Sequence, residues 1–220
     1  MGTRGDTSPD AVHHPLFARF YARFSVAADQ SAGIVAIRAE FLAALSGRVI
    51  EIGAGNGLNF PHYPTSVSEV VALEPERSLR ALAVRAADGA GVTVEVVPGV
   101  AEALPVENAS FDAAVMSLVL CSVRDVPRAL SEVRRVLRPG GELRFFEHGL
   151  ARTPGAARVQ RVLDRTVWPH LFGGCHTSRD TVAALEEAGF HDIRYERFRL
   201  PERGLAAPTS PCVRGVAHNP

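Results

Sequence analysis

The residues best suited to chemistry surround a turn of three glycines. Gly53, Gly55 and Gly57 follow an apolar run of strand type, and Glu51 stands two positions before the first of them. Glycine tolerates positive φ and has no Cβ, so such a turn lets the backbone pass close to a nucleotide-like ligand at the start of a helix. Glu74 ends the next apolar run, where parallel α/β folds bind ribose hydroxyls. The pattern predicts a nucleotide-type site.

The glycine spacing separates two kinds of nucleotide site. A dinucleotide fingerprint needs a small residue five positions after the first glycine, and Leu58 stands there instead. The order E-x-G-x-G-x-G over 51–57 resembles the class I S-adenosylmethionine-dependent methyltransferases. In that family the turn holds the methionine end of the cofactor, and the next acidic residue holds its ribose. The resemblance implies S-adenosyl-L-methionine as cofactor, with S-adenosyl-L-homocysteine as product. A tight turn without a ligand is the alternative.

Composition limits the classes of protein that fit this chain. Its 220 residues, 46% hydrophobic and 22% charged, suffice for one well-filled α/β domain but are few for two. Lys plus Arg and Asp plus Glu are 24 each, so no basic field would gather nucleic acid. No stretch is typical of a signal peptide or a membrane span. We expect a cytoplasmic protein that acts on a small molecule, and its oligomeric state stays open.

The cysteine pattern predicts neither a disulfide framework nor a metal site. Cys121, Cys175 and Cys212 lie far apart in the sequence and form no C-x-x-C pair. Such spacing suits a reducing compartment. We expect Cys121 to behave as a small buried side chain.

Alternating strand and helix patterns predict a doubly wound, Rossmann-like α/β fold with a seven-stranded sheet. The sheet is expected to be mostly parallel, with one antiparallel strand near the C-terminus. Strands are expected near 48–53, 69–74, 92–97, 111–118, 141–147, 192–198 and 211–218, and helices near 57–62, 76–88, 125–137 and 179–188. The helix at 125–137 is the clearest, because Asp125 can cap it and Pro127 lies in its first turn.

The chain is predicted to divide into a tail and one methyltransferase domain. Residues 1–15 are polar and carry Pro and Gly, which is typical of a mobile tail. The domain covers 16–220, with a helical lid at 16–46, a cofactor-binding core at 47–148 and an acceptor-pocket insertion at 149–178.

The methyltransferase resemblance implies further cofactor contacts. Residues 99–118 are similar to the family's third signature, but Val100 stands where many members have the Asp that binds the adenine amino group. Ala101 and Glu102 are the implied replacement, although Glu102 could instead be a solvated residue at a helix start. Leu118, at the end of the fourth strand, would touch the cofactor. Tyr21 lies in a segment that covers the cofactor in relatives.

Two histidines are candidate general bases. Methyl transfer from a sulfonium needs mainly alignment and exclusion of water, so a base would help only a phenol or carbon acid. His148 ends the fifth strand, and His176 lies in a Gly-Gly-Cys-His turn. The alternative for both is a structural histidine that holds a loop carbonyl.

The segment after the fifth strand narrows the resemblance. This part of the chain is similar to animal alkyl-thiol S-methyltransferases and their bacterial relatives. The residues that carry the similarity are Phe146-Glu147-His148, Gln160, Asp164, Trp168, Gly174-Cys175 and Arg179, with 213–217. The implied acceptor is the thiol sulfur of a small apolar molecule, such as a secondary metabolite. O-, N- or C-methylation of a quinone, phenol, amine or lipid headgroup is the alternative. A non-catalytic nucleotide-binding module is a further one.

Overall fold

The computed structural model describes residues 15–31, 33–201 and 207–220. The tail predicted for 1–15 therefore lies outside the described residues, apart from Pro15. The described helices are α1 (Pro15–Ser31), α2 (Ile34–Leu42), η2 (Phe60–His62), α3 (Arg77–Ala87), α4 (Val126–Val136), α5 (Pro154–Asp164), α6 (Trp168–Leu171) and α7 (Thr181–Glu187). The strands are β1 (Gly47–Ile52), β2 (Val67–Leu73), β3 (Val94–Val97), β4 (Phe111–Ser117), β5 (Leu137–His148), β6 (His191–Arg199) and β7 (Pro211–His218).

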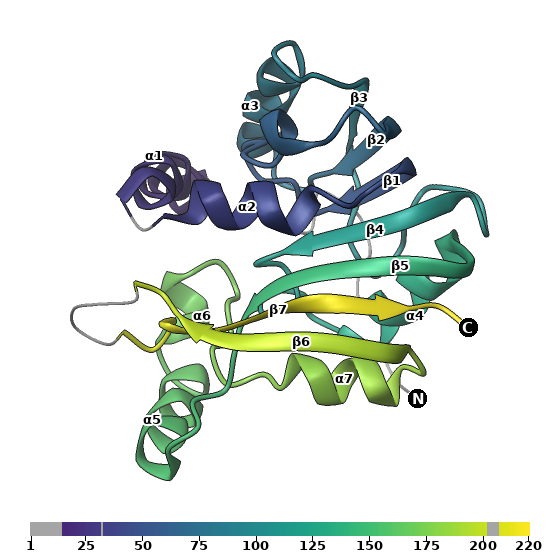
Figure 1. Cartoon of the computed structure of the whole chain (residues 1–220). Helices are drawn as coiled ribbons and strands as arrows, with labels where there is room; N and C mark the ends of the chain where they lie inside the picture. Colours follow the sequence, from purple (N-terminus) through teal and green to yellow (C-terminus); the bar gives the residue numbers. More distant parts are fainter. Residues whose placement is uncertain (1–14, 32, 202–206) are drawn as a thin grey trace, which may run out of the picture.

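The strands form a seven-stranded sheet in the order β3-β2-β1-β4-β5-β7-β6. β7 runs antiparallel to both β5 and β6, and the remaining pairs are parallel. This confirms the predicted sheet with one antiparallel strand near the C-terminus. Figure 1 shows α1 and α6 at the edge toward which β4 and β6 point. In a parallel sheet this carboxyl edge is where ligands bind.

Side chains alternate between the two faces of the sheet, and each face has its own core. Ile50 and Ile52 of β1 pack with α4 and α7 on one face. Val49 of the same strand packs with α2, η2 and α3 on the other. Strands buried on both faces explain the continuous apolar runs that predicted them.

Three expected elements differ from the structure. The helix expected at 57–62 is only the short 3-10 helix η2, because Tyr63 precedes Pro64 and is extended. β5 begins at Leu137, four residues before the expected start. The segment 149–178 contains two helices, α5 and α6, where none was predicted. The helix α4 agrees well, and the Asp125 side chain accepts a hydrogen bond from the Arg128 N–H.

Candidate active site

The glycine turn lies at the carboxyl end of β1, and all three glycines have positive φ. A Cβ added to Gly53 would meet the Val119 side chain at 2.6 Å, so this glycine is required by packing. A Cβ at Gly55 would meet only the Tyr21 ring, at 3.5 Å and beyond. Gly55 thus faces the space beneath α1. Backbone that faces such a space without a Cβ suits the close approach of a cofactor.

Glu74 joins the end of β2 to the glycine turn. Its carboxylate accepts hydrogen bonds from the Gly55 N–H at 2.8 Å and from the Glu76 N–H at 2.9 Å. Burial raises the pKa of Glu74 to about 7, against the lowering effect of these two bonds. The structure therefore brings Glu74 and Gly55 together, as the fingerprint predicted. Ribose binding by Glu74 stays a prediction.

Glu51 has a different environment from the one expected of a ligand-binding carboxylate. It is buried, and its two oxygens accept hydrogen bonds from Asn59 at 2.8 Å and from the Tyr63 hydroxyl at 2.7 Å. Burial raises the pKa of Glu51 to about 7. Both oxygens are bonded to the segment that follows the glycine turn, so the visible role of Glu51 is to fix that segment.

A buried polar network connects α1 and α2 to the same segment. Arg38 of α2 donates to Asp29 of α1 at 2.8 Å and to Asn59 at 2.6 Å. Its side chain also reaches the Ser117 hydroxyl, at the end of β4, at 3.4 Å. A buried guanidinium is stable only with such partners. Sequence reasoning missed Arg38, because an arginine in an amphipathic helix is typical of a solvated face.

Tyr21 of α1 lies over the glycine turn. Burial raises the pKa of its phenol to about 12, and the charges of Arg38, Glu74 and Cys121 all act on it. The phenol is therefore near both the ribose candidate and the end of β4. Tyr21 lies where the resemblance expected it, and a direct contact with cofactor stays a prediction.

Ala101 and Glu102 occupy the turn after β3. Ala101 is buried in the core beneath α4. The Glu102 carboxylate accepts hydrogen bonds from the Arg124 N–H at 2.8 Å and the Asp125 N–H at 3.2 Å. Glu102 therefore stabilises the backbone just before α4. This role is close to the alternative stated above, a residue at a helix start. Adenine contact by this pair stays a prediction.

The turn after β4 is strained and strongly hydrogen-bonded. Leu118 has φ +60° and donates its N–H to the Phe146 carbonyl at 2.6 Å. Glu147, completely buried, accepts the N–H groups of the next three residues, Val119, Leu120 and Cys121. Backbone strain of this kind persists only where surrounding contacts enforce it. Sequence reasoning quoted Glu147 within a motif but gave it no role.

His148 lies with two cysteines. The ligand atoms of Cys121, His148 and Cys175 all lie within 4.8 Å of one another, and His148 Nδ1 is 3.6 Å from Cys175 Sγ. The neighbouring Cys121 thiol lowers the pKa of Cys175, whereas the Cys175 thiol and burial raise the pKa of Cys121. Burial lowers the pKa of His148, but its interactions with the Cys121 thiol and, to a smaller extent, with Glu147 raise it overall. The wide sequence spacing of Cys121 and Cys175 thus did not indicate that the two thiols are neighbours in space.

His176 makes the contact that the structural alternative predicted. Its ring Nδ1 lies 2.7 Å from the Gly174 carbonyl, and its backbone N–H donates to the Cys121 carbonyl at 2.7 Å. The backbone bond attaches the 173–176 turn to the turn after β4, whereas the ring contact lies within the 173–176 turn itself. A base role for His176 stays an untested prediction, and the ring is engaged in holding its own loop.

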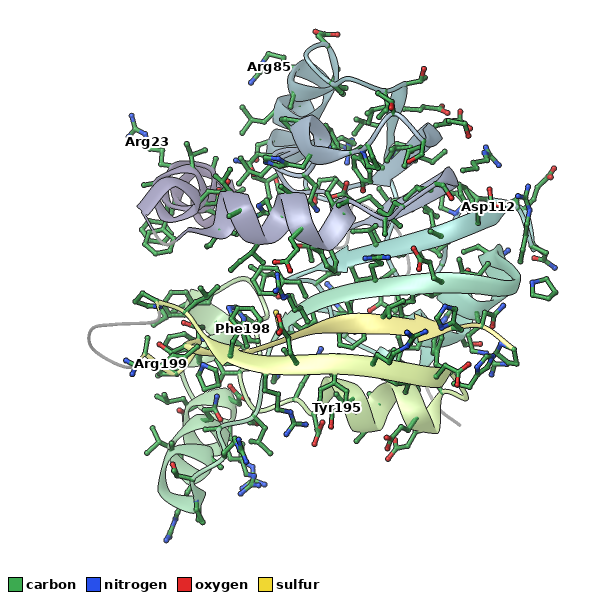
Figure 2. The ribbon with its side chains drawn as sticks, in the orientation of Figure 1. Arg23, Arg85, Asp112, Tyr195, Phe198 and Arg199 are labelled. Carbon is green, nitrogen blue, oxygen red and sulfur yellow. The ribbon has the colours of Figure 1, made fainter. Side chains whose placement is uncertain are left out.

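A cavity of about 410 Å³ lies beside the predicted acceptor insertion. Its walls come from 149–153, from the start of α7 and from the ends of β6 and β7, including Arg179, Phe198 and Cys212. Figure 2 shows Phe198 and Arg199 at the same edge as α1, with Asp112 at the opposite end of the sheet. Phe198 stacks on Phe146 with ring centroids 5.8 Å apart.

Comparisons with known proteins agree on the class. The family described as "Methyltransferase domain" matches residues 50–145. The thiol S-methyltransferase TMT1B of Homo sapiens is 38% identical over 184 residues, which are 80% of this chain and 73% of the human protein. A ubiquinone/menaquinone biosynthesis C-methyltransferase UbiE of Methylobacterium nodulans is 37% identical over 140 residues, 56% of this chain and 54% of that protein.

Solved structures show the same fold. A SAM-dependent methyltransferase of Thermotoga maritima, described as a possible histamine N-methyltransferase, aligns with a TM-score of 0.67 and 22% identity. The alignment covers 93% of this chain and 99% of that one. With the glycine turn and the relatives above, the chain belongs to the class I S-adenosylmethionine-dependent methyltransferases. S-adenosylmethionine is its cofactor and S-adenosylhomocysteine its product.

Within the described ranges, every helix falls short of the length and apolar character that a membrane crossing requires.

Proposed function

We infer that this enzyme methylates the sulfur of a small, largely apolar thiol. The observation that carries this proposal is the identity with human thiol S-methyltransferase TMT1B over 80% of the chain. The polar groups at the carboxyl edge support it, because Cys121 after β4 and His148 at the end of β5 lie together with Cys175 from the turn after α6. When bound, S-adenosylmethionine supplies an electrophilic methyl group on a sulfonium.

We assign the binding roles as follows. Gly53, Gly55 and Gly57 shape the cradle for the methionine end, and Glu74 accepts hydrogen bonds from the ribose. Glu74 can do so by exchanging its present bond to Gly55 for ribose hydroxyls. Tyr21 covers the cofactor from α1, with 16–46 as a lid that excludes water. These roles follow from position and from the family resemblance.

The acceptor is proposed to enter between α1 and the 149–178 insertion. His148 with the two cysteines would meet the reactive atom of the acceptor there. Methyl transfer is an in-line displacement, so these residues would act mainly by orienting the acceptor, because a thiol can lose its proton to solvent. Leu118 would pack against the sulfonium side.

The test is a methyl-transfer assay on the full chain with matched alkyl and aryl thiols, alcohols, phenols and amines. Selective conversion of thiols supports the proposal. Equal or better conversion of an oxygen, nitrogen or carbon acceptor contradicts it. C-methylation of a quinone is the second candidate, favoured by the match to the UbiE protein, and a demethylated quinone belongs in the same panel.

The reaction is proposed to take place in the cytoplasm. All three cysteines are free thiols, which suits a reducing compartment. Fractionation of cells that express the tagged chain, with detection in the membrane and soluble fractions, tests this. Recovery in the membrane fraction would contradict it.

A further inference from the structure

Three potential metal ligands converge at the carboxyl edge of the sheet. Cys121 follows β4, His148 ends β5, and Cys175 lies in the turn after α6. Their ligand atoms lie within 4.8 Å of one another, with His148 Nδ1 and Cys175 Sγ 3.6 Å apart. Two sulfurs and one imidazole are the donor set that zinc prefers. Tetrahedral zinc, with bonds of about 2.3 Å to sulfur and 2.0–2.1 Å to nitrogen, separates its ligand atoms by about 3.5–3.8 Å.

Among the residues that the structure describes, no fourth His, Cys, Asp or Glu joins this group. We propose that Cys121, His148 and Cys175 bind one zinc ion, and that its fourth position is open to the acceptor. Three protein ligands with one exchangeable position are the arrangement of catalytic zinc sites, whereas structural sites have four protein ligands. Cys212, the third buried cysteine, is outside the cluster and instead contacts the Thr209 carbonyl.

The ligands are fixed by hydrogen bonds before any ion binds. Glu147 holds the backbone of the Cys121 turn through three N–H groups. The His176 N–H donates to the Cys121 carbonyl and so joins the Cys175 turn to it. Asp164 accepts both N–H groups of 177–178, just after Cys175. Such outer partners hold metal ligands in a bound geometry.

The same cluster lies next to the predicted cofactor site. The turn that carries Cys121 packs on the glycine turn, since a Cβ on Gly53 would be 2.6 Å from Val119. The Tyr21 phenol lies within electrostatic reach of both Glu74 and Cys121. A group bound at the fourth position of the ion would thus lie close to the predicted cofactor site.

The ion would promote loss of the thiol proton, a role that a histidine base could otherwise fill. This step rests on the proposed function. The thiol R–SH replaces water at the fourth position and loses its proton to solvent, since zinc deprotonates a coordinated thiol. Its sulfur then forms a bond to the methyl carbon while the carbon–sulfonium bond breaks. The products are a neutral thioether, S-adenosylhomocysteine and the proton released earlier. A thioether is a weaker zinc ligand than a thiolate, so it leaves.

Metal binding can be tested without any acceptor. The full chain is purified under reducing conditions, treated with chelator and titrated with Co²⁺, whose absorption reports tetrahedral geometry and thiolate ligands. We expect one Co²⁺ per chain, thiolate charge-transfer bands, and displacement by one equivalent of Zn²⁺. A six-coordinate spectrum without thiolate bands, or no binding, would overturn the proposal.

Variants identify the ligands. Cys121→Ser and Cys175→Ser should each weaken zinc binding by about 100-fold or more. Substituting a residue that only hydrogen-bonds to a metal ligand typically costs about 10–100-fold, and loss of a ligand itself should cost at least as much. Cys212→Ser is the matched control, since it also removes a buried thiol, and it should leave zinc affinity unchanged. S-adenosylhomocysteine binding by each variant shows that the domain is folded. An equal loss in Cys212→Ser would contradict the assignment.

A second measurement tests the open position. Addition of an alkyl thiol to the Co²⁺ protein should increase the charge-transfer absorption by one further thiolate, and the matched alcohol should not. Metal binding without this increase overturns acceptor coordination but leaves the site in place. Thiol methylation by the metal-free enzyme at the full rate would overturn a catalytic role for zinc while the proposed function stands.

Discussion

At the scale of single residues, the candidate cofactor site depends on contacts between the ends of β1 and β2. Glu74 already bonds the Gly55 N–H, and its burial makes every lost partner costly. The Gly55 backbone faces the space below Tyr21, where a side chain would compete with a ligand. Two substitutions separate these contributions.

Glu74→Ala should weaken S-adenosylhomocysteine binding by about 1–3 kcal/mol, because ribose hydroxyls would lose a buried acceptor. Calorimetric titration measures the change in affinity. Glu69→Ala is the matched control, since this carboxylate lies on β2, the strand that Glu74 follows, but pairs with Arg48 at the surface. An unchanged affinity in Glu74→Ala would remove this residue from the ribose site.

Gly55→Ala should reduce cofactor affinity by more than it reduces stability. The substitution places a Cβ at φ +59°, a conformation that costs about 1–2 kcal/mol in L-residues. Gly33→Ala is the control, because Gly33 has φ +70° and no atom lies within 4 Å of its added Cβ. Urea unfolding should show similar losses for both variants, whereas titration should show weaker binding for Gly55→Ala alone. Equal affinities would place the cofactor elsewhere.

At the scale of elements, a buried ion pair joins α1 to α2, and a hydrogen bond from the same arginine joins them to the site. Arg38 bonds Asp29 across the two helices and Asn59 beyond the glycine turn. The same turn is fixed from the sheet side by Glu51. The position of the predicted lid is therefore coupled to the geometry of the cofactor cradle.

Arg38→Met should destabilise the fold by about 3–5 kcal/mol, because it leaves the buried Asp29 carboxylate without its cation. Arg38→Met combined with Asp29→Asn should recover part of that loss. Urea unfolding of both single variants and the double variant gives the coupling energy. Additive effects would show that the pair does not join α1 to α2.

At the scale of the whole molecule, the buried Glu51 makes stability depend on pH. Its pKa is about 7 in the fold and near 4.5 in the unfolded chain, so the folded state retains the proton between these values. The stability from this group is complete below pH 4.5 and is lost as pH rises through 7. Other buried carboxyls titrate in the same range, so a variant is needed to isolate it.

Glu51→Gln keeps a neutral side chain at every pH. Its free energy of unfolding relative to wild type should therefore rise between pH 5 and pH 8, by up to about 3 kcal/mol. Urea unfolding of both proteins at several pH values measures this difference. Glu69→Gln controls for the loss of one negative charge. A difference that is constant with pH would contradict the raised pKa.

Much of the fold was predictable from local patterns. Apolar runs of 4–8 residues separated by helical patterns gave the strand sequence, and Asp125 correctly predicted the start of α4. The predicted helix at 57–62 failed because the extended residue before Pro64 limits it to one short turn. The helices α5 and α6 were missed because α5 exposes apolar residues such as Val159 and Val162, so its pattern lacks a clean buried face.

The sequence by itself determined the class of enzyme and its cofactor, because a glycine turn and an acidic residue one strand later form a local fingerprint. Only the tertiary structure decided that Cys121, His148 and Cys175 are neighbours, that Glu51 and Glu102 bond to protein, and that Arg38 is buried. These facts depend on which strand ends share an edge and on how the turn after α6 bonds back to β4. Contacts between distant segments have no periodic signature in the chain, since they form only when the sheet assembles.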